Sequence, residues 1–157
     1  MTTETTSRVT VTHRYAASPE RVFDAFLDVR IARRFLFATA TGEMITAEVE
    51  PRVGGRFTFT ERRPDMGDVR HVGEYREIDR PRRLVFAFGV PQFDPRTTVV
   101  TVEIRPAGDG CELTLTHDGL PPDYLKRTHE GWSRILAGLL PAYDGVHAAG
   151  WRVSAER

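Results

Sequence analysis

The chain has 157 residues, and its 22 basic and 22 acidic side chains balance to a formal net charge of zero. A chain of this length forms one ordinary domain with a sizeable core. The balanced charge argues against nucleic-acid binding, which usually leaves a basic stripe on the surface. No apolar run approaches the roughly 18 residues of a membrane span, and the single cysteine excludes an intrachain disulfide. We therefore expect one cytoplasmic domain over residues 1–157, without membrane association.

The first predicted elements are one strand and two short helices. Residues 1–7 form a polar, Thr-rich lead that we expect to be flexible. Residues 8–15 alternate apolar with polar side chains, which predicts a strand. Ser18 is a suitable N-cap and is followed by a proline, so a short amphipathic helix should begin there and end near Asp28. Residues 31–37 predict a second short helix.

Strand patterns dominate from residue 43 onward. Six further segments have a strand-like pattern and are separated by turns that contain Gly, Pro or Asp: residues 44–49, 56–61, 69–79, 84–88, 97–105 and 111–117. Because short turns join successive strands, this arrangement is typical of an antiparallel meander.

The last predicted element is a long helix that follows the Pro121-Pro122 pair. Its stripe residues recur at spacings of three and four, and they are Leu125, His129, Trp132, Leu136, Leu139 and Tyr143. A single helix of this kind must pack against a sheet to bury its apolar face. Pro141 removes a helical hydrogen bond, so we expect a break or kink there. Residues 141–157 are then a C-terminal tail with no predicted structure.

This order of elements predicts an α+β fold. A curved antiparallel sheet of about seven strands should wrap around the long C-terminal helix, with two short helices between the first and second strands. A strongly twisted sheet around one helix leaves a gap between them, which is a suitable place for a small-molecule site.

Several short motifs occur in a fixed order between residues 8 and 140. They are residues 17–26 (ASPERVFDAF), 53–57 (VGGRF), 73–75 (GEY), 78–86 (IDRPRRLVF), 113–120 (LTLTHDGL) and 130–132 (EGW). In this order they resemble the heat-shock protein 90 ATPase activator homologue family, within the START-like helix-grip (SRPBCC) superfamily. The resemblance implies a helix-grip fold. It implies no single function, since that superfamily includes hydrophobic-ligand carriers, polyketide cyclases and chaperone-associated domains.

Ten side chains are candidates for lining a cavity between the sheet and the helix. They are aromatic or aliphatic residues and one histidine: Phe35, Phe37, Phe57, Phe59, Tyr75, Phe86, Phe88, His117, Trp132 and Leu136. An apolar concavity with a few polar groups is typical of a ligand site. For most of these residues the alternative is ordinary core packing, since a half-buried sheet also shows alternating aromatic residues.

Three functions remain open from the sequence. The first hypothesis is binding of a small apolar or amphipathic ligand in the cavity. The second is a cyclase- or dehydratase-like enzyme with His117 or His129 as general acid/base. The third is a chaperone- or stress-associated interaction protein. This hypothesis has less support, because the chain has no room for the separate amino-terminal domain with which the eukaryotic activators work.

No cofactor is expected, because phosphate-binding, nucleophile-elbow and zinc motifs do not occur in the sequence. A metal site is not expected either, since His117 and His129 lack the spacing of a metal pair and no Cys or carboxylate pattern completes a site. Trp151 in the tail offers a possible homodimer contact.

Overall fold

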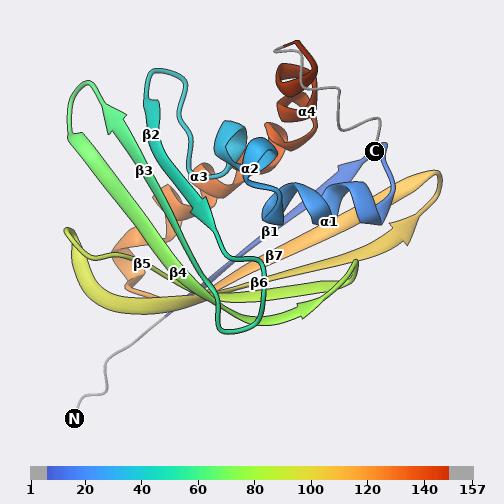
Figure 1. The fold of residues 1–157 in the computed structure, drawn as a ribbon. Coiled ribbons are helices and arrows are strands. Elements are labelled where there is room, and N and C mark those ends of the chain that lie inside the picture. Colours follow the sequence, from blue (N-terminus) through green and yellow to red (C-terminus); the bar gives the residue numbers. More distant parts are fainter. Residues whose placement is uncertain (1–6, 149–157) are drawn as a thin grey trace.

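The computed structural model describes residues 7–148, which form one antiparallel sheet and four α-helices (Figure 1). The strands are β1 (Ser7–Tyr15), β2 (Glu43–Val49), β3 (Arg56–Arg63), β4 (Gly67–Asp79), β5 (Arg83–Val90), β6 (Asp94–Ala107) and β7 (Gly110–Leu120). The helices are α1 (Pro19–Leu27), α2 (Val29–Phe35), α3 (Leu125–Ala137) and α4 (Leu139–Ala148), with a 3₁₀ turn, η1 (Pro122–Tyr124), before α3.

The strand order in the sheet is β1-β7-β6-β5-β4-β3-β2, and every neighbouring pair is antiparallel. Strands β1 and β2 follow one another in the chain but lie at opposite edges of the sheet, and α1 and α2 connect them. The sheet curves, and the helices lie on its concave side (Figure 1). The predicted helix-grip fold, with seven strands and two short helices after the first strand, is confirmed.

The two short helices begin where the sequence contains good caps. The Ser18 side chain accepts a hydrogen bond from the Arg21 backbone N–H at 3.1 Å, and Pro19 occupies the first turn of α1. Asp28 ends α1 and caps α2 by accepting from the Arg30 backbone N–H at 3.0 Å. Side-chain caps satisfy backbone donors that have no partner inside a helix. One residue, Asp28, thus separates α1 from α2.

The C-terminal helix is interrupted a few residues before the expected position. We predicted a break near Pro141, but α3 ends at Ala137 and α4 begins at Leu139. Proline has no N–H for the carbonyl four residues before it, and its ring clashes with that carbonyl, so the disruption falls upstream, at Ala137. Within α4, Pro141 lies in the first turn, where a backbone N–H has no intrahelical partner. Helix α4 extends to Ala148, and Trp151 lies outside the described residues.

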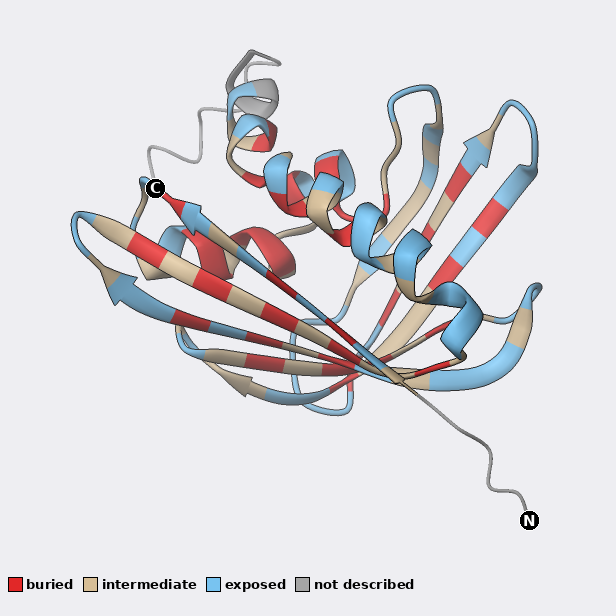
Figure 2. Ribbon diagram, turned by 180° about the vertical axis from the view of Figure 1, so that it is seen from behind, coloured by how far each residue is buried: buried red, intermediate tan, exposed pale blue. Residues whose placement is uncertain are grey.

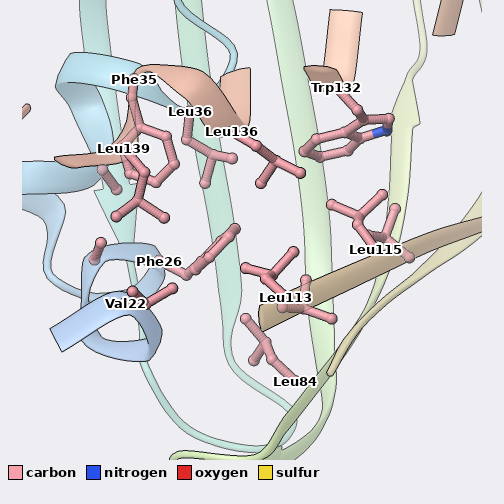
Figure 3. Close-up of a cluster of buried hydrophobic side chains, with 14 of the residues drawn as sticks. Val22, Phe26, Phe35, Leu36, Leu84, Leu113, Leu115, Trp132, Leu136 and Leu139 are labelled. Carbon is pink, nitrogen blue, oxygen red and sulfur yellow. The ribbon is translucent and has the colours of Figure 1, made fainter. Parts of the chain in front are cut away.

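Buried and exposed residues alternate along most strands (Figure 2). The buried faces meet the helices in one cluster, in which Phe35, Leu36, Leu136 and Leu139 lie close to Phe26 of α1 (Figure 3). This cluster is the main hydrophobic core.

A tyrosine of the first strand fixes the end of α3 in the core. The Tyr15 hydroxyl donates to the Leu136 carbonyl oxygen at 2.7 Å. This carbonyl lies in the last turn of α3. Burial raises the pKa of Tyr15 well above its usual value, so the hydroxyl keeps its proton. The hydrogen bond therefore connects edge strand β1 to the end of α3.

Candidate functional site

A pocket of about 470 Å³ lies at one end of the space between the sheet and α3. Its walls come from the β3–β4 hairpin, the β5–β6 hairpin, the end of β7 and the first half of α3, all on the left-hand side of Figure 1. Two hollows of similar volume are lined mainly by charged or polar residues of the strands. The pocket beside α3 differs from them because most of its lining is apolar.

Phe37 is the centre of the aromatic wall. Its ring stacks on His71 with centroids 4.7 Å apart and on Phe88 at 5.0 Å. It also meets Trp132 edge-on at 5.7 Å. Phe37 has a φ of +62°, the left-handed region, which is rare for a bulky residue and costs about 1–3 kcal/mol. The ring contacts on three sides hold this strained conformation, so the pocket wall is preformed.

A hydrogen-bond chain crosses the back of the pocket from α3 to the sheet. Trp132 Nε1 donates to His117 Nδ1 at 2.9 Å, and His117 Nε2 lies 2.7 Å from Thr98 Oγ1. An indole N–H can only donate, so Nδ1 is the acceptor and the proton of a neutral imidazole is on Nε2. The Thr98 hydroxyl oxygen accepts a hydrogen bond from this N–H, and the hydroxyl donates to the Phe88 carbonyl oxygen at 3.2 Å. Both ring nitrogens of His117 are therefore engaged within the protein.

A second buried histidine, His71, belongs to the side wall. Its Nδ1 lies 3.1 Å from the Phe59 carbonyl oxygen and must donate, which leaves Nε2 as an acceptor. Burial lowers the pKa of His71 to about 4 and that of His117 to about 4. Both imidazoles are consequently neutral near pH 7.

An ion pair stands at the end of β3, beside the pocket. Glu61 is 1% exposed and accepts from Arg63 Nε at 2.6 Å, from the Thr39 backbone N–H at 2.6 Å and from Thr39 Oγ1 at 2.8 Å. Burial alone would raise the pKa of Glu61, but these hydrogen bonds outweigh it and the pKa is lowered. The carboxylate is therefore ionised at neutral pH, and it holds Arg63 in the pocket lining.

Three exposed apolar side chains stand at the mouth of the pocket. Met66 from the β3–β4 turn is 50% exposed, Phe93 from the β5–β6 turn 53%, and Tyr124 from η1 36%. The Arg127 guanidinium lies 5.3 Å from the centroid of the Tyr124 ring. Apolar surface from three separate elements thus converges on one opening, which marks it as a candidate binding site.

The predicted lining residues divide into two groups. Four of them line the pocket: Phe37, Phe88, His117 and Trp132. The other six are buried in the core and do not line it: Phe35, Phe57, Phe59, Tyr75, Phe86 and Leu136. Ligand contact by any of these residues stays a prediction.

The sequence analysis placed His129 on the inner stripe of the helix, and this is wrong, because the side chain is exposed. At about 100° per residue, His129 lies roughly 60° around α3 from Trp132, at the margin of the buried stripe. The sheet covers Trp132 and Leu136 but not this margin. Of the two histidines considered as a general acid/base, His117 lines the pocket and His129 does not.

Several pocket residues were missed from the sequence. His71 has a signal that could have found it, since it alternates in register with Val69 and Tyr75, which are buried on the same face. Arg63, Met66 and Phe93 lie at or near hairpin turns, where no periodicity indicates direction.

Within residues 7–148 no cluster of three or more His, Cys, Asp or Glu side chains is arranged to bind a metal ion. None of the helices in that range is long and apolar enough to cross a membrane.

Comparison with known proteins gives these features a family context. A family model described as Activator of Hsp90 ATPase homolog 1-like protein matches residues 16–143. A solved structure from Chromobacterium violaceum has 23% identity and a TM-score of 0.76, with 84% of this chain and 93% of that chain covered. An AHSA1-like protein from Aeromonas hydrophila has 22% identity and a TM-score of 0.74, with 92% and 95% covered.

A Plasmodium falciparum protein described as an HSP90 activator is a further structural relative. It has 27% identity and a TM-score of 0.63, and 83% of this chain and 91% of that chain are covered. Comparison with curated proteins gives no match.

Proposed function

The chain belongs to the Activator of Hsp90 ATPase homolog 1-like family, and from this premise we propose that it binds a small apolar or amphipathic molecule in the pocket beside α3. The observation that carries the proposal is the open, mostly apolar volume of about 470 Å³. Ligand sites are commonly concave, largely apolar and about 300–1,000 Å³ in volume, with a few placed polar groups.

The wall of the pocket supports binding because it is rigid and has few polar groups. The rings of Phe37, Phe88 and Trp132 are fixed by mutual contacts and by the hydrogen bond from Trp132 to His117. A preformed site loses little conformational entropy when a ligand enters. His71 is one of the few polar side chains in the lining. Such a surface suits a flat apolar body with a small number of polar atoms.

The same geometry favours binding over catalysis. A general base needs a free nitrogen within hydrogen-bond reach of the substrate, but both nitrogens of His117 already have partners. His129 is exposed and does not line the pocket. A cyclase- or dehydratase-like mechanism would therefore have to use other groups than the two histidines considered from the sequence.

A chaperone-associated role is the second candidate function. It is supported by the description of the Plasmodium falciparum relative as an HSP90 activator and by the exposed side chains of Met66, Phe93 and Tyr124 at the pocket mouth. Exposed apolar groups that cluster can contact a protein partner as well as a small molecule.

Gly131 offers a direct test of ligand binding. It lines the pocket on α3, and a Cβ added there meets no atom within 4 Å. Gly131→Phe should place a ring in the pocket and displace the ligand, whereas Gly131→Ala should leave the volume almost unchanged. Both replacements remove a helical glycine, which disfavours a helix by about 1 kcal/mol relative to alanine, so neither should unfold the chain.

The measurement is native mass spectrometry of the protein purified from its own host. We expect a bound small molecule on the wild type and on Gly131→Ala, and none on Gly131→Phe. An equal ligand load on Gly131→Phe would contradict the pocket as the site. An unliganded wild type that also shows no thermal shift with a panel of apolar and amphipathic compounds would contradict ligand binding altogether, and capture of a chaperone would then be tested.

A further inference from the structure

The pocket has a charged feature that a purely apolar ligand would not need. We propose that Arg63 recognises a carboxylate, so that the ligand is an amphipathic anion with an aromatic or aliphatic body. This inference rests on the proposed ligand-binding function and specifies the chemical class of the ligand.

Arg63 is held in place by a buried carboxylate. Its Nε donates to Glu61 Oε1 at 2.6 Å, and its side chain is 22% exposed while that of Glu61 is 1% exposed. Glu61 in turn accepts two hydrogen bonds from Thr39. The arginine therefore has a fixed position at the pocket wall and loses little entropy when it binds a further group.

The Glu61 contact uses one of the five N–H donors of the guanidinium. Among the described residues, neither terminal nitrogen of Arg63 donates a hydrogen bond. A planar guanidinium matches a carboxylate through charge-assisted hydrogen bonds, which are shorter and stronger than neutral ones. The unused donors of Arg63 can therefore bind the acidic group of a ligand whose body lies in the pocket.

Most of the charged groups in the lining are positive. Arg63, Arg96 and Arg127 line the pocket with one carboxylate, Asp94, which Arg96 binds at 2.9 Å. Because Glu61 also pairs with Arg63 from behind the lining, the excess amounts to one positive charge. The two histidines of the lining are neutral near pH 7, because burial lowers their pKa values to about 4. A cleft with an excess of positive charge attracts anions.

The body of the ligand would lie against the aromatic wall formed by Phe37, Phe88 and Trp132. The proposed ligand thus combines a flat or extended apolar part with one carboxylate. Aromatic acids and medium-chain fatty acids both have this chemistry.

The test compares two probes that share one apolar body, of which only one has a carboxylate. 1-Naphthylacetate and 1-naphthylacetamide have the same ring system and nearly the same shape, and their dissociation constants can be measured by titration calorimetry at pH 7 and low salt. We expect the wild type to bind the carboxylate about tenfold more tightly, the size expected for one charge-assisted hydrogen bond at a partly exposed site.

The matching variant replaces both members of the pair. Removing Arg63 alone would leave Glu61 buried without its partner, which is strongly destabilising, so the test variant is Glu61→Gln with Arg63→Gln. It should lose the tenfold preference while binding the amide within about twofold of the wild type. The control is Arg62→Gln, because Arg62 neighbours Arg63 but pairs with Asp68 at 3.0 Å and is 60% exposed.

The outcomes distinguish a failure of carboxylate recognition from a failure of ligand binding in the pocket. Equal affinity of the wild type for both probes would overturn carboxylate recognition but leave the proposed function intact, whereas binding of neither probe would count against the proposed function itself. A folded double variant that loses both probes equally would show that the pair shapes the pocket without reading charge. An equal loss of preference in Arg62→Gln would show that general surface charge is responsible, and it would also overturn the proposal.

Discussion

The two ends of the interior are built from the same kind of strand and yet differ in what they enclose. At one end, Phe86 is 2% exposed and packs against Phe57 and other core residues. At the other end, Phe37 and Phe88 line an open pocket. The aromatic residues alternate in the same way along β3 and β5, so the pattern alone does not separate core from pocket.

The difference comes from the elements that cover the sheet. Helices α1, α2 and α4 gather over the filled end, where Phe26, Phe35 and Leu139 contribute to the cluster (Figures 1 and 3). At the open end α3 runs beside hairpin ends, and no second α-helix of residues 7–148 covers it (Figure 1). An aromatic face becomes core where another apolar element covers it and becomes a binding surface where none does.

The largest expected effect comes from a matched pair of substitutions on β5. Phe86 is 2% exposed and meets Phe57 edge-on at 5.2 Å, while Phe88 lies two residues further on the same face, in the pocket wall. Phe86→Ala should lower the free energy of unfolding by about 3–5 kcal/mol, as expected for a fully packed phenylalanine. Phe88→Ala should have a smaller effect, because one side of its ring already faces open space.

Urea denaturation of both variants measures this difference. Ligand binding should show the reverse order. Phe88→Ala should weaken the binding of 1-naphthylacetamide, whereas a folded Phe86→Ala should retain it. Equal losses of stability would show that the pocket wall is as tightly packed as the core, and the contrast between the two ends would fail.

The next effect is a dependence of stability on pH that comes from the open end. Burial lowers the pKa of His71 and of His117 to about 4, whereas the unfolded chain has histidines near 6.5. Between these values the unfolded state binds more protons, so stability is lost as the pH falls from about 6.5 to about 4. The loss is on the order of 3 kcal/mol for each histidine at the lower limit.

Urea denaturation between pH 4.5 and 7 checks this expectation. His71→Gln removes one of the two groups and should reduce the pH-dependent loss by roughly half. His129→Gln removes an exposed histidine of α3 and should retain the wild-type dependence. A wild-type stability that stays constant over this range would contradict the neutral, buried state of both imidazoles.

Much of the fold could be predicted because it depends on local patterns. Alternation along residues 111–117 predicts β7, and the Ser18 cap predicts the start of α1; both are confirmed. The sequence pattern also predicts an interruption in the C-terminal helix, but the break falls at the residue whose carbonyl the proline cannot satisfy. Patterns with a fixed period thus give the elements and leave their ends uncertain by a few residues.

The candidate site was harder to predict because it depends on what lies opposite each residue. Phe86 and Phe88 have the same periodic position, and only the three-dimensional arrangement places one in the core and the other in the pocket. Glu61 and Arg63 lie two residues apart on β3, so alternation places both on the face of Phe57 and Phe59, whereas their charge alone argues for exposure. A buried ion pair is uncommon on sequence grounds, since charged residues are seldom buried unless paired.

The smallest expected effect on stability comes from the pocket mouth, where exposed apolar side chains contribute little to folding. Phe93 is 53% exposed, so Phe93→Ala should change the free energy of unfolding by no more than about 0.5 kcal/mol. The same change removes apolar surface from the opening and should weaken 1-naphthylacetamide binding by roughly two- to fivefold. Val53→Ala is the control, because Val53 is 60% exposed on the β2–β3 turn and does not line the pocket. Calorimetric titration measures the affinity of both variants, and equal affinities would show that the ligand does not reach the mouth. Urea denaturation measures their stability, and a loss above about 1 kcal/mol for Phe93→Ala would show that Phe93 belongs to the packed interior.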